Sequence, residues 1–240
     1  MSKSERTVRR HFDRLAVSHN FKKTDDRHIN LTFDGVYFGR ELCYMVFRAE
    51  SRTIYFEECQ ENVENIGRIL MSLEREGYVF KSFTVDGRKG IKQYLKSHYP
   101  DVPIQHCLFH QKAAITRYLT GRPKTECGRE LKELIQTLGT TDRTVFEEAF
   151  NALNQRFRGF LKERNENGQF SHRRLRSAFR SIKKNLPELF TFQEYPGLKI
   201  PTTTNSCEGY FGQLKRKARV HSGLTREHLK KVIMRLLLGR

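Results

Sequence analysis

The stretch PTTTNSCEGYFGQLKRKARVHSG, residues 201–223, decides how we interpret the rest of the chain. Asn205 suits the capping position of a helix, and Glu208 stands three residues later, where the acid of a capping box belongs. The apolar residues recur at helical spacing and predict one buried stripe: Cys207, Phe211, Leu214 and Ala218. The stretch therefore predicts a helix that begins at Asn205.

Glu208 lies on a different face of this predicted helix. Gly212, Lys215 and Arg219 follow it on that face, so one carboxylate projects beside a position without a side chain and then a row of cations. A carboxylate that holds a divalent metal, beside cations that bind a phosphodiester backbone, would have this pattern. The alternative is that Glu208 only caps a solvated basic helix, because capping boxes are common.

The composition points to a polyanionic partner. The 240 residues include 45 Lys and Arg against 27 Asp and Glu, a net charge of +18, which most simply indicates nucleic acid. A membrane surface is the other polyanion, but no stretch approaches the ~18 apolar residues of a spanning helix, so we expect no membrane partner. The five scattered cysteines favour reduced thiols, and we expect a cytoplasmic protein.

Residues 29–119 alternate strands and helices. HINLTFDGVYF, ELCYMVFRA and RTIYFEE read as a three-stranded antiparallel meander, with the first strand expected to end at Asp34-Gly35 and the second buried on both faces. A helix from Asn62 to Glu76 follows. Strands within YVFKSFTVDGRKGI, expected to end at Asp86-Gly87, and at PIQHCLFH then alternate with helices at GIKQYLKSHYP and at residues 111–119. The order predicts an α/β fold with a mixed sheet flanked by helices.

Residues 120–196 are expected to form an all-helical insertion. Three helical patterns follow one another, and the third, HRRLRSAFRSIKKNL, has Leu175, Phe179, Ile182 and Leu186 as its inner stripe. Most of its remaining surface is basic and holds no acid, which favours a face towards nucleic acid over a plain solvated face: Arg173, Arg174, Arg176, Arg180, Lys183 and Lys184.

The two ends of the chain complete the predicted organisation. Residues 1–28 are either a basic arm or the last helix of a helix-turn-helix, and residues 29–119 are the first part of the core. Residues 197–240 hold the helix at Asn205 and a closing amphipathic helix.

Three acids stand out by their positions. Asp34 and Asp86 each follow an apolar strand and precede a glycine, and Glu208 begins a late helix. If the first and fourth strands are neighbours, a helix crossing their edge would bring the three carboxylates together, and their repulsion would require a cation. Carboxylate oxygens suit Mg²⁺ or Mn²⁺. The alternative for each Asp-Gly pair is a simple turn.

Cys107 and His110 form a Cys-x-x-His step at the end of the last predicted strand, PIQHCLFH. Such a step is half of a zinc site, to which His106 and Cys127 could contribute, although no second pair has suitable spacing. A buried Cys with an exposed His is the plain alternative. A third is that His110 faces the same edge as Asp86 and touches the scissile phosphate or a water.

Taken together, these motifs resemble those of Mutator-like transposases of bacterial insertion sequences. The resemblance rests on FDG at residues 33–35, VDG at 85–87, CLFH at 107–110 and TNSCEGYFGQLKRKAR at 204–219, and it covers roughly residues 30–225. It implies a ribonuclease-H-like core with an all-helical insertion before the last catalytic helix. It also implies that Asp34, Asp86 and Glu208 hold two Mg²⁺ ions, cut the element's ends and join the 3′-hydroxyls to target DNA, with His110 and Cys107 near the catalytic edge.

The same resemblance suggests a shortened copy, because such transposases usually carry an end-recognition region before the core. We expect double-stranded DNA as the partner, a homo-oligomer on DNA, association with the bacterial nucleoid, and DNA contacts from two groups of cations: Lys215, Arg216, Lys217 and Arg219, and Arg173, Arg176, Arg180 and Lys183. Two alternatives stay open. One is a ribonuclease-H-like nuclease or resolvase without strand transfer, and the other is a non-catalytic DNA-binding remnant.

Overall fold

The computed structural model describes residues 26–39, 42–50, 52–220 and 225–238. Within these ranges the side chains of residues 89, 205–208, 210, 219 and 220 are not described. The chain divides into two compact units, one with the residues up to Val79 and from Asn205 onward, the other spanning Phe80–Thr204. The predicted N-terminal arm or helix at residues 1–28 lies outside the described residues up to position 25.

The first unit contains the predicted meander. Strands β1 (His28–Phe38), β2 (Leu42–Ala49) and β3 (Arg52–Glu58) pair antiparallel in chain order. The expectation that the first strand ends at Asp34-Gly35 is wrong, because Asp34 pairs with Val46 and the ladder continues to Phe38. The β-prone residues after Gly35 extend the pairing with β2 and override the local turn signal.

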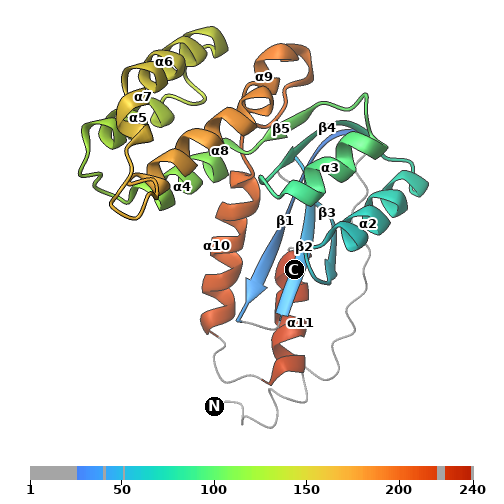
Figure 1. The fold of residues 1–240 in the computed structure, drawn as a ribbon. Helices are drawn as coiled ribbons and strands as arrows, with labels where there is room; N and C mark the ends of the chain where they lie inside the picture. The colour runs from blue at the N-terminus through green and yellow to red at the C-terminus, as the bar shows by residue number, and fades with distance from the viewer. Residues whose placement is uncertain (1–25, 40–41, 51, 221–224, 239–240) are drawn as a thin grey trace. The chain divides into compact units, whose positions relative to one another are not determined.

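Two helices of the first unit pack on this meander. Phe211 and Leu214 of α10 (Asn205–Val220) and Ile233 and Leu237 of α11 (Arg226–Leu237) share an apolar cluster with buried residues of β1, β2 and β3. Figure 1 shows both helices beside these strands. The predicted stripe of the helix at Asn205 is thus confirmed at its described members, and β2 is buried at all eight positions, as expected.

The helix α2 (Val63–Arg75) lies within one residue of the predicted bounds at each end, with Asn62 and Glu76 as its caps. The Asn62 side chain accepts a hydrogen bond from the backbone N–H of Asn65 at 2.8 Å, which caps the first turn. Gly77 has φ +90°, a backbone conformation that glycine adopts more readily than other residues, and it stops the helix.

The second unit continues the alternation. Strand β4 (Val79–Val85), helix α3 (Lys89–His98), strand β5 (Ile104–His106) and helix α4 (Leu108–Leu119) follow, and β4 pairs with β5 in parallel. The strand order of the sheet is β3-β2-β1-β4-β5, so the predicted mixed α/β sheet with flanking helices is confirmed. The prediction that the strand PIQHCLFH continues to His110 is wrong, because β5 ends at His106. Helix α4 starts three residues earlier than predicted, at Leu108, which puts Cys107 at the position before the helix.

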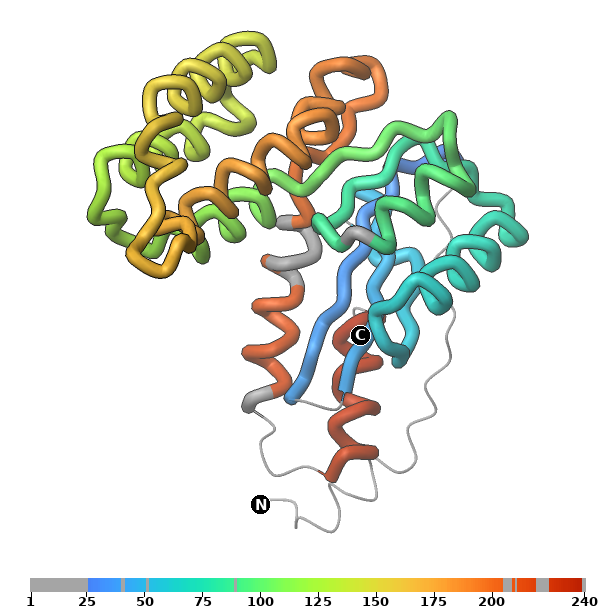
Figure 2. Tube along the Cα trace, in the orientation of Figure 1, coloured from blue at the N-terminus to red at the C-terminus, as the bar shows by residue number. Residues whose placement is uncertain are grey.

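The predicted helical segment is also present. Helices α5 (Glu126–Gln136), α6 (Arg143–Arg156), α7 (Arg158–Lys162), α8 (Arg173–Leu189) and α9 (Thr191–Glu194) precede a short 3₁₀ turn, η1 (Pro196–Leu198). Their buried faces share one apolar cluster with α4, which includes Phe146, Phe150, Phe179 and Ile182. Figure 2 traces α4 and α8 side by side through this unit. Among the helices of the described ranges, none is both long enough and apolar enough to cross a lipid bilayer.

Candidate nucleic-acid site around Asp86

The three predicted catalytic acids lie in different parts of the described chain. Asp34 is half-buried within β1, where its Oδ1 accepts a hydrogen bond from the Gly35 N–H at 2.8 Å. Asp86 directly follows β4, as expected, and Glu208 falls in the first turn of α10, with its side chain outside the described set. Among the described side chains, no group of three or more His, Cys, Asp or Glu could hold a metal ion. Convergence of the three carboxylates therefore stays a prediction.

Asp86 lies in a hollow of about 770 Å³ within the second unit. The same hollow is lined by His106, by His110 of α4 and by cations from the β4–α3 loop, α4 and α8: Arg88, Arg117, Arg180 and Lys184. The Asp86 side chain is 18% exposed, and its Oδ2 pairs with Nε of Arg88 at 3.2 Å while its Oδ1 accepts from the Arg88 backbone N–H at 3.1 Å. The structure thus brings together Asp86, His110 and Arg180 of the predicted site.

The carboxylate oxygens of Asp86 have the chemistry that a hard divalent cation requires. Arg88 now supplies the positive charge that this carboxylate needs, so a metal ion would have to share or replace that contact. Arg88 was not among the predicted site residues, although its position two residues after Asp86 is a signal for a local ion pair.

A buried histidine lies beneath the β4–α3 loop at Asp86-Gly87. His106 is 2% exposed, and its Nδ1 has no hydrogen-bond partner among the described atoms. Burial and then the charge of Lys92 lower its pKa to about 3, so the imidazole is neutral near pH 7. A Cβ on Gly87 would come within 2.5 Å of His106 Cε1, so the absence of a side chain at Gly87 lets the loop pack against this ring.

We expect Gly87→Ala to reduce the free energy of unfolding by about 1–3 kcal/mol, the usual range for overpacking a filled site. The added methyl group would collide with a ring that is itself buried, so the loop carrying Asp86 must shift. Urea denaturation measures the effect. Gly121→Ala is the matched control, since a methyl group at that position would meet no atom within 4 Å; an equal loss in both variants would contradict this contact.

His106 also predicts a pH dependence of stability. The pKa of His106 in the folded chain lies below the ordinary value of about 6.5. Below pH 6.5 the unfolded chain therefore binds a proton at this histidine, while the folded chain keeps the ring neutral. The free energy of unfolding should then fall by about 2 kcal/mol more between pH 7 and pH 5 in the wild type than in His106→Gln. Urea titrations at the two pH values test this. His98→Gln, which changes an exposed histidine, is the control variant.

Cys107 and His110 meet the segment that precedes α10. The Cys107 Sγ lies 3.3 Å from Thr204 Oγ1 and accepts from the Thr204 N–H at 3.3 Å, and Thr204 Oγ1 is 3.5 Å from His110 Nδ1. Burial opposes ionisation of the Cys107 thiol, but hydrogen bonds from His110 and Thr204 outweigh it and lower its pKa. Cys127 lies instead in the helical apolar cluster, so the described residues give the zinc alternative no support.

Two further hydrogen bonds hold the same segment. Thr84 Oγ1 of β4 donates to the Pro201 carbonyl at 2.6 Å, and the Leu108 N–H of α4 donates to the Thr202 carbonyl at 2.9 Å. Thr204 immediately precedes Asn205, the first residue of α10, and Glu208 is four residues after Thr204. The CLFH motif therefore anchors the chain just before the helix that carries the third predicted acid.

The predicted DNA-binding cations have different surroundings. Arg173, Arg180 and Lys183 of α8 are exposed, as are Lys215, Arg216 and Lys217 of α10, while the Arg219 side chain is outside the described set. Arg176 is engaged within the chain, because it donates to the Leu161 carbonyl at 2.6 Å and lies 3.5 Å over the Phe170 ring centroid.

Comparison with known proteins finds a likeness in structure. No protein-family model and no curated protein matches the chain. Among solved structures, the chain is similar to the Drosophila P element transposase strand transfer complex, with 11% sequence identity and a TM-score of 0.46 over 98% of this chain and 85% of that chain.

Proposed function

We propose that the chain is a DDE transposase that cleaves transposon ends and joins them to target DNA. One observation carries the proposal: Asp86 and His110, from two separate motifs, line a single hollow whose other charged residues are cations. A carboxylate among cations suits a site where a phosphodiester backbone reacts. The motif around Glu208 supports the finer assignment to the Mutator-like type of bacterial insertion sequences.

Each residue has a distinct proposed role. Asp86, Asp34 and Glu208 supply the carboxylates for Mg²⁺ or Mn²⁺, which when bound would activate the attacking oxygen and stabilise the leaving oxygen. His110 contacts the phosphate or a water, and Arg180 with Lys184 neutralises the backbone. The protein works as a homo-oligomer on double-stranded DNA.

A strand-transfer assay tests this function. Labelled DNA from either side of the protein's own gene is incubated with the protein, Mg²⁺ and an unlabelled plasmid. We expect the label to be joined covalently to the plasmid through a 3′-end. Hydrolysed fragments without joined product would contradict the transposase and favour a nuclease. Binding without any cleavage in Mg²⁺ or Mn²⁺ would favour a DNA-binding remnant.

A further inference from the structure

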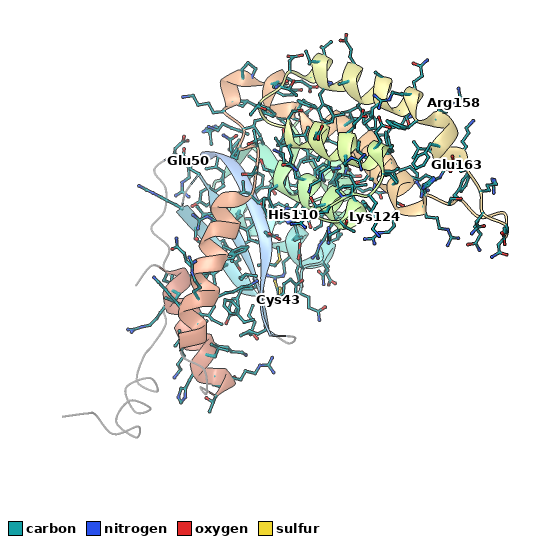
Figure 3. All side chains as sticks on the ribbon, turned by 90° about the vertical axis from the view of Figure 1, so that its left-hand side faces the viewer. Cys43, Glu50, His110, Lys124, Arg158 and Glu163 are labelled. Atoms are coloured by element: carbon teal, nitrogen blue, oxygen red, sulfur yellow. The ribbon has the colours of Figure 1, made fainter. Side chains whose placement is uncertain are left out.

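The hollow at Asp86 continues along the seam between α4 and α8. A second hollow of about 520 Å³ shares Ala114, Arg117, Tyr118 and Ser177 with the first. A third, of about 290 Å³, shares Tyr118, Arg173 and Arg174 with the second and reaches Lys124 and Thr125. We call this series the α4–α8 groove. Figure 3 labels His110, which lines its first hollow, and Lys124, which lines its third.

Apart from Asp86, the Asp, Glu, Lys and Arg residues that line the groove are all cations. Its lining includes seven cations: Arg88, Arg117, Lys124, Arg173, Arg174, Arg180 and Lys184. Asp86 is the one acid among the described lining residues, and it already pairs with Arg88. Cations on the walls of a groove concentrate the field within it and attract a polyanionic chain. A phosphate backbone matches this lining better than a compact ligand, because the charges are spread over three successive hollows.

One aromatic side chain stands where the hollows meet. Tyr118 lines all three of them, and it is 36% exposed, so part of the ring is open to the groove. An exposed aromatic ring among cations is the usual platform on which an unpaired base stacks. A base inside a duplex has both faces covered by its neighbours, so it could not use this ring without leaving the stack.

We propose that the α4–α8 groove binds a single strand of DNA, with its phosphates on the cations and an unpaired base on Tyr118, on the path that leads to Asp86. The proposal rests on the proposed function only in placing the reacting phosphate at Asp86. Binding of the strand follows from the lining itself and requires neither metal nor catalysis.

Fluorescence anisotropy in the presence of a chelator tests the proposal with labelled DNA, as a single strand and as a blunt duplex of the same sequence. Tyr118→Ala should weaken single-strand binding by roughly 5- to 150-fold, the range expected for one lost stacked base, and should change duplex binding much less. Tyr118→Phe keeps the ring and should bind like the wild type. Tyr195→Ala removes an exposed ring outside the groove and should also have no effect.

A variant that removes two cations tests single-strand binding in the groove without changing the Tyr118 ring. Arg117→Gln with Arg173→Gln should lower single-strand affinity and flatten the slope of log affinity against log salt, by about 0.7 for each lost phosphate contact. Arg75→Gln, an exposed arginine on α2, is the control. Equal losses for single strand and duplex in Tyr118→Ala, or no loss in either groove variant, would overturn the proposal. Because the chelator excludes catalysis, this outcome is distinct from failure of the strand-transfer assay.

Discussion

Replacing Asp86 by Asn is expected to abolish DNA cleavage and joining while leaving DNA binding at or above the wild-type level. The amide keeps the shape of the side chain but supplies a weaker ligand to a divalent cation and removes a negative charge from a basic hollow. The loss of several kcal/mol of metal assistance predicts a fall in rate of about a thousandfold or more. Gel-based cleavage and anisotropy measure the two effects on the same preparation.

The matched control is Asp101→Asn, which changes an exposed acid of the same unit. It should retain wild-type cleavage. Asp34→Asn and Glu208→Gln should behave like Asp86→Asn, because all three residues have the same proposed role. Substantial cleavage by any one of these three variants would remove that residue from the proposed site.

The second large effect concerns stability. Glu188 of α8 is 8% exposed and forms ion pairs with Lys92 at 2.8 Å and with Lys96 at 2.5 Å, both from α3. Burial favours the neutral form of Glu188, but its bonds to the two lysines outweigh this and lower its pKa. Glu188→Gln would leave Lys92 buried without its anionic partner, so we expect the free energy of unfolding to fall by about 3 kcal/mol or more.

Denaturant unfolding measures this loss, and two variants test its cause. Glu194→Gln, which removes an exposed partner of Arg143, should lower the free energy of unfolding by less than about 1 kcal/mol. Lys92→Met combined with Glu188→Gln should recover part of the stability lost in Glu188→Gln, since no buried charge is then unpaired. If the loss of stability in the double variant equals the sum of the losses in Lys92→Met alone and Glu188→Gln alone, the coupling between the two residues is contradicted.

The pH dependence of this contribution has a defined sign. The folded-state pKa of Glu188 lies below its unfolded value, so the stabilisation is present above about pH 4.3 and is lost as the pH falls through the folded pKa. The buried Lys92 also has a lowered pKa, because burial outweighs its bond to Glu188. At neutral pH the charged form of Lys92 therefore reduces the stability that the ion pair provides. Removing both charges is therefore less harmful than removing one.

The order of elements could be predicted because each has a local pattern. Residues close together in the sequence determine three of these patterns, and the structure has all three: the apolar run of β2, the Asn62 cap of α2 and the apolar stripe of α8. The end of β1 could not be predicted, because Asp34-Gly35 is a local turn signal that pairing with β2 overrides. Helix α6 likewise ends at Arg156, and a separate short helix follows Phe157, although the helical pattern runs on without a break.

The candidate site could be predicted only through its motifs. VDG and CLFH single out Asp86 and His110, and both residues line the same hollow. The packing of His106 under Gly87 and the bond of Thr204 to Cys107 could not be predicted, because they join residues 19 and 97 positions apart. Such contacts leave no periodic signal in the sequence. The contacts of Thr204 with Cys107 and His110 join both residues of the Cys-x-x-His step to the segment before α10.

Iron-directed cleavage of the protein backbone tests the shared metal site most directly. Fe²⁺ would replace Mg²⁺, and ascorbate with peroxide would generate radicals that cut the chain near the bound ion. We predict cuts close to Asp34, Asp86 and Glu208 together, all suppressed by excess Mg²⁺ and all lost in Asp86→Asn. Cuts near only one of these residues, or cuts that survive in Asp86→Asn, would contradict a metal site shared by the three acids.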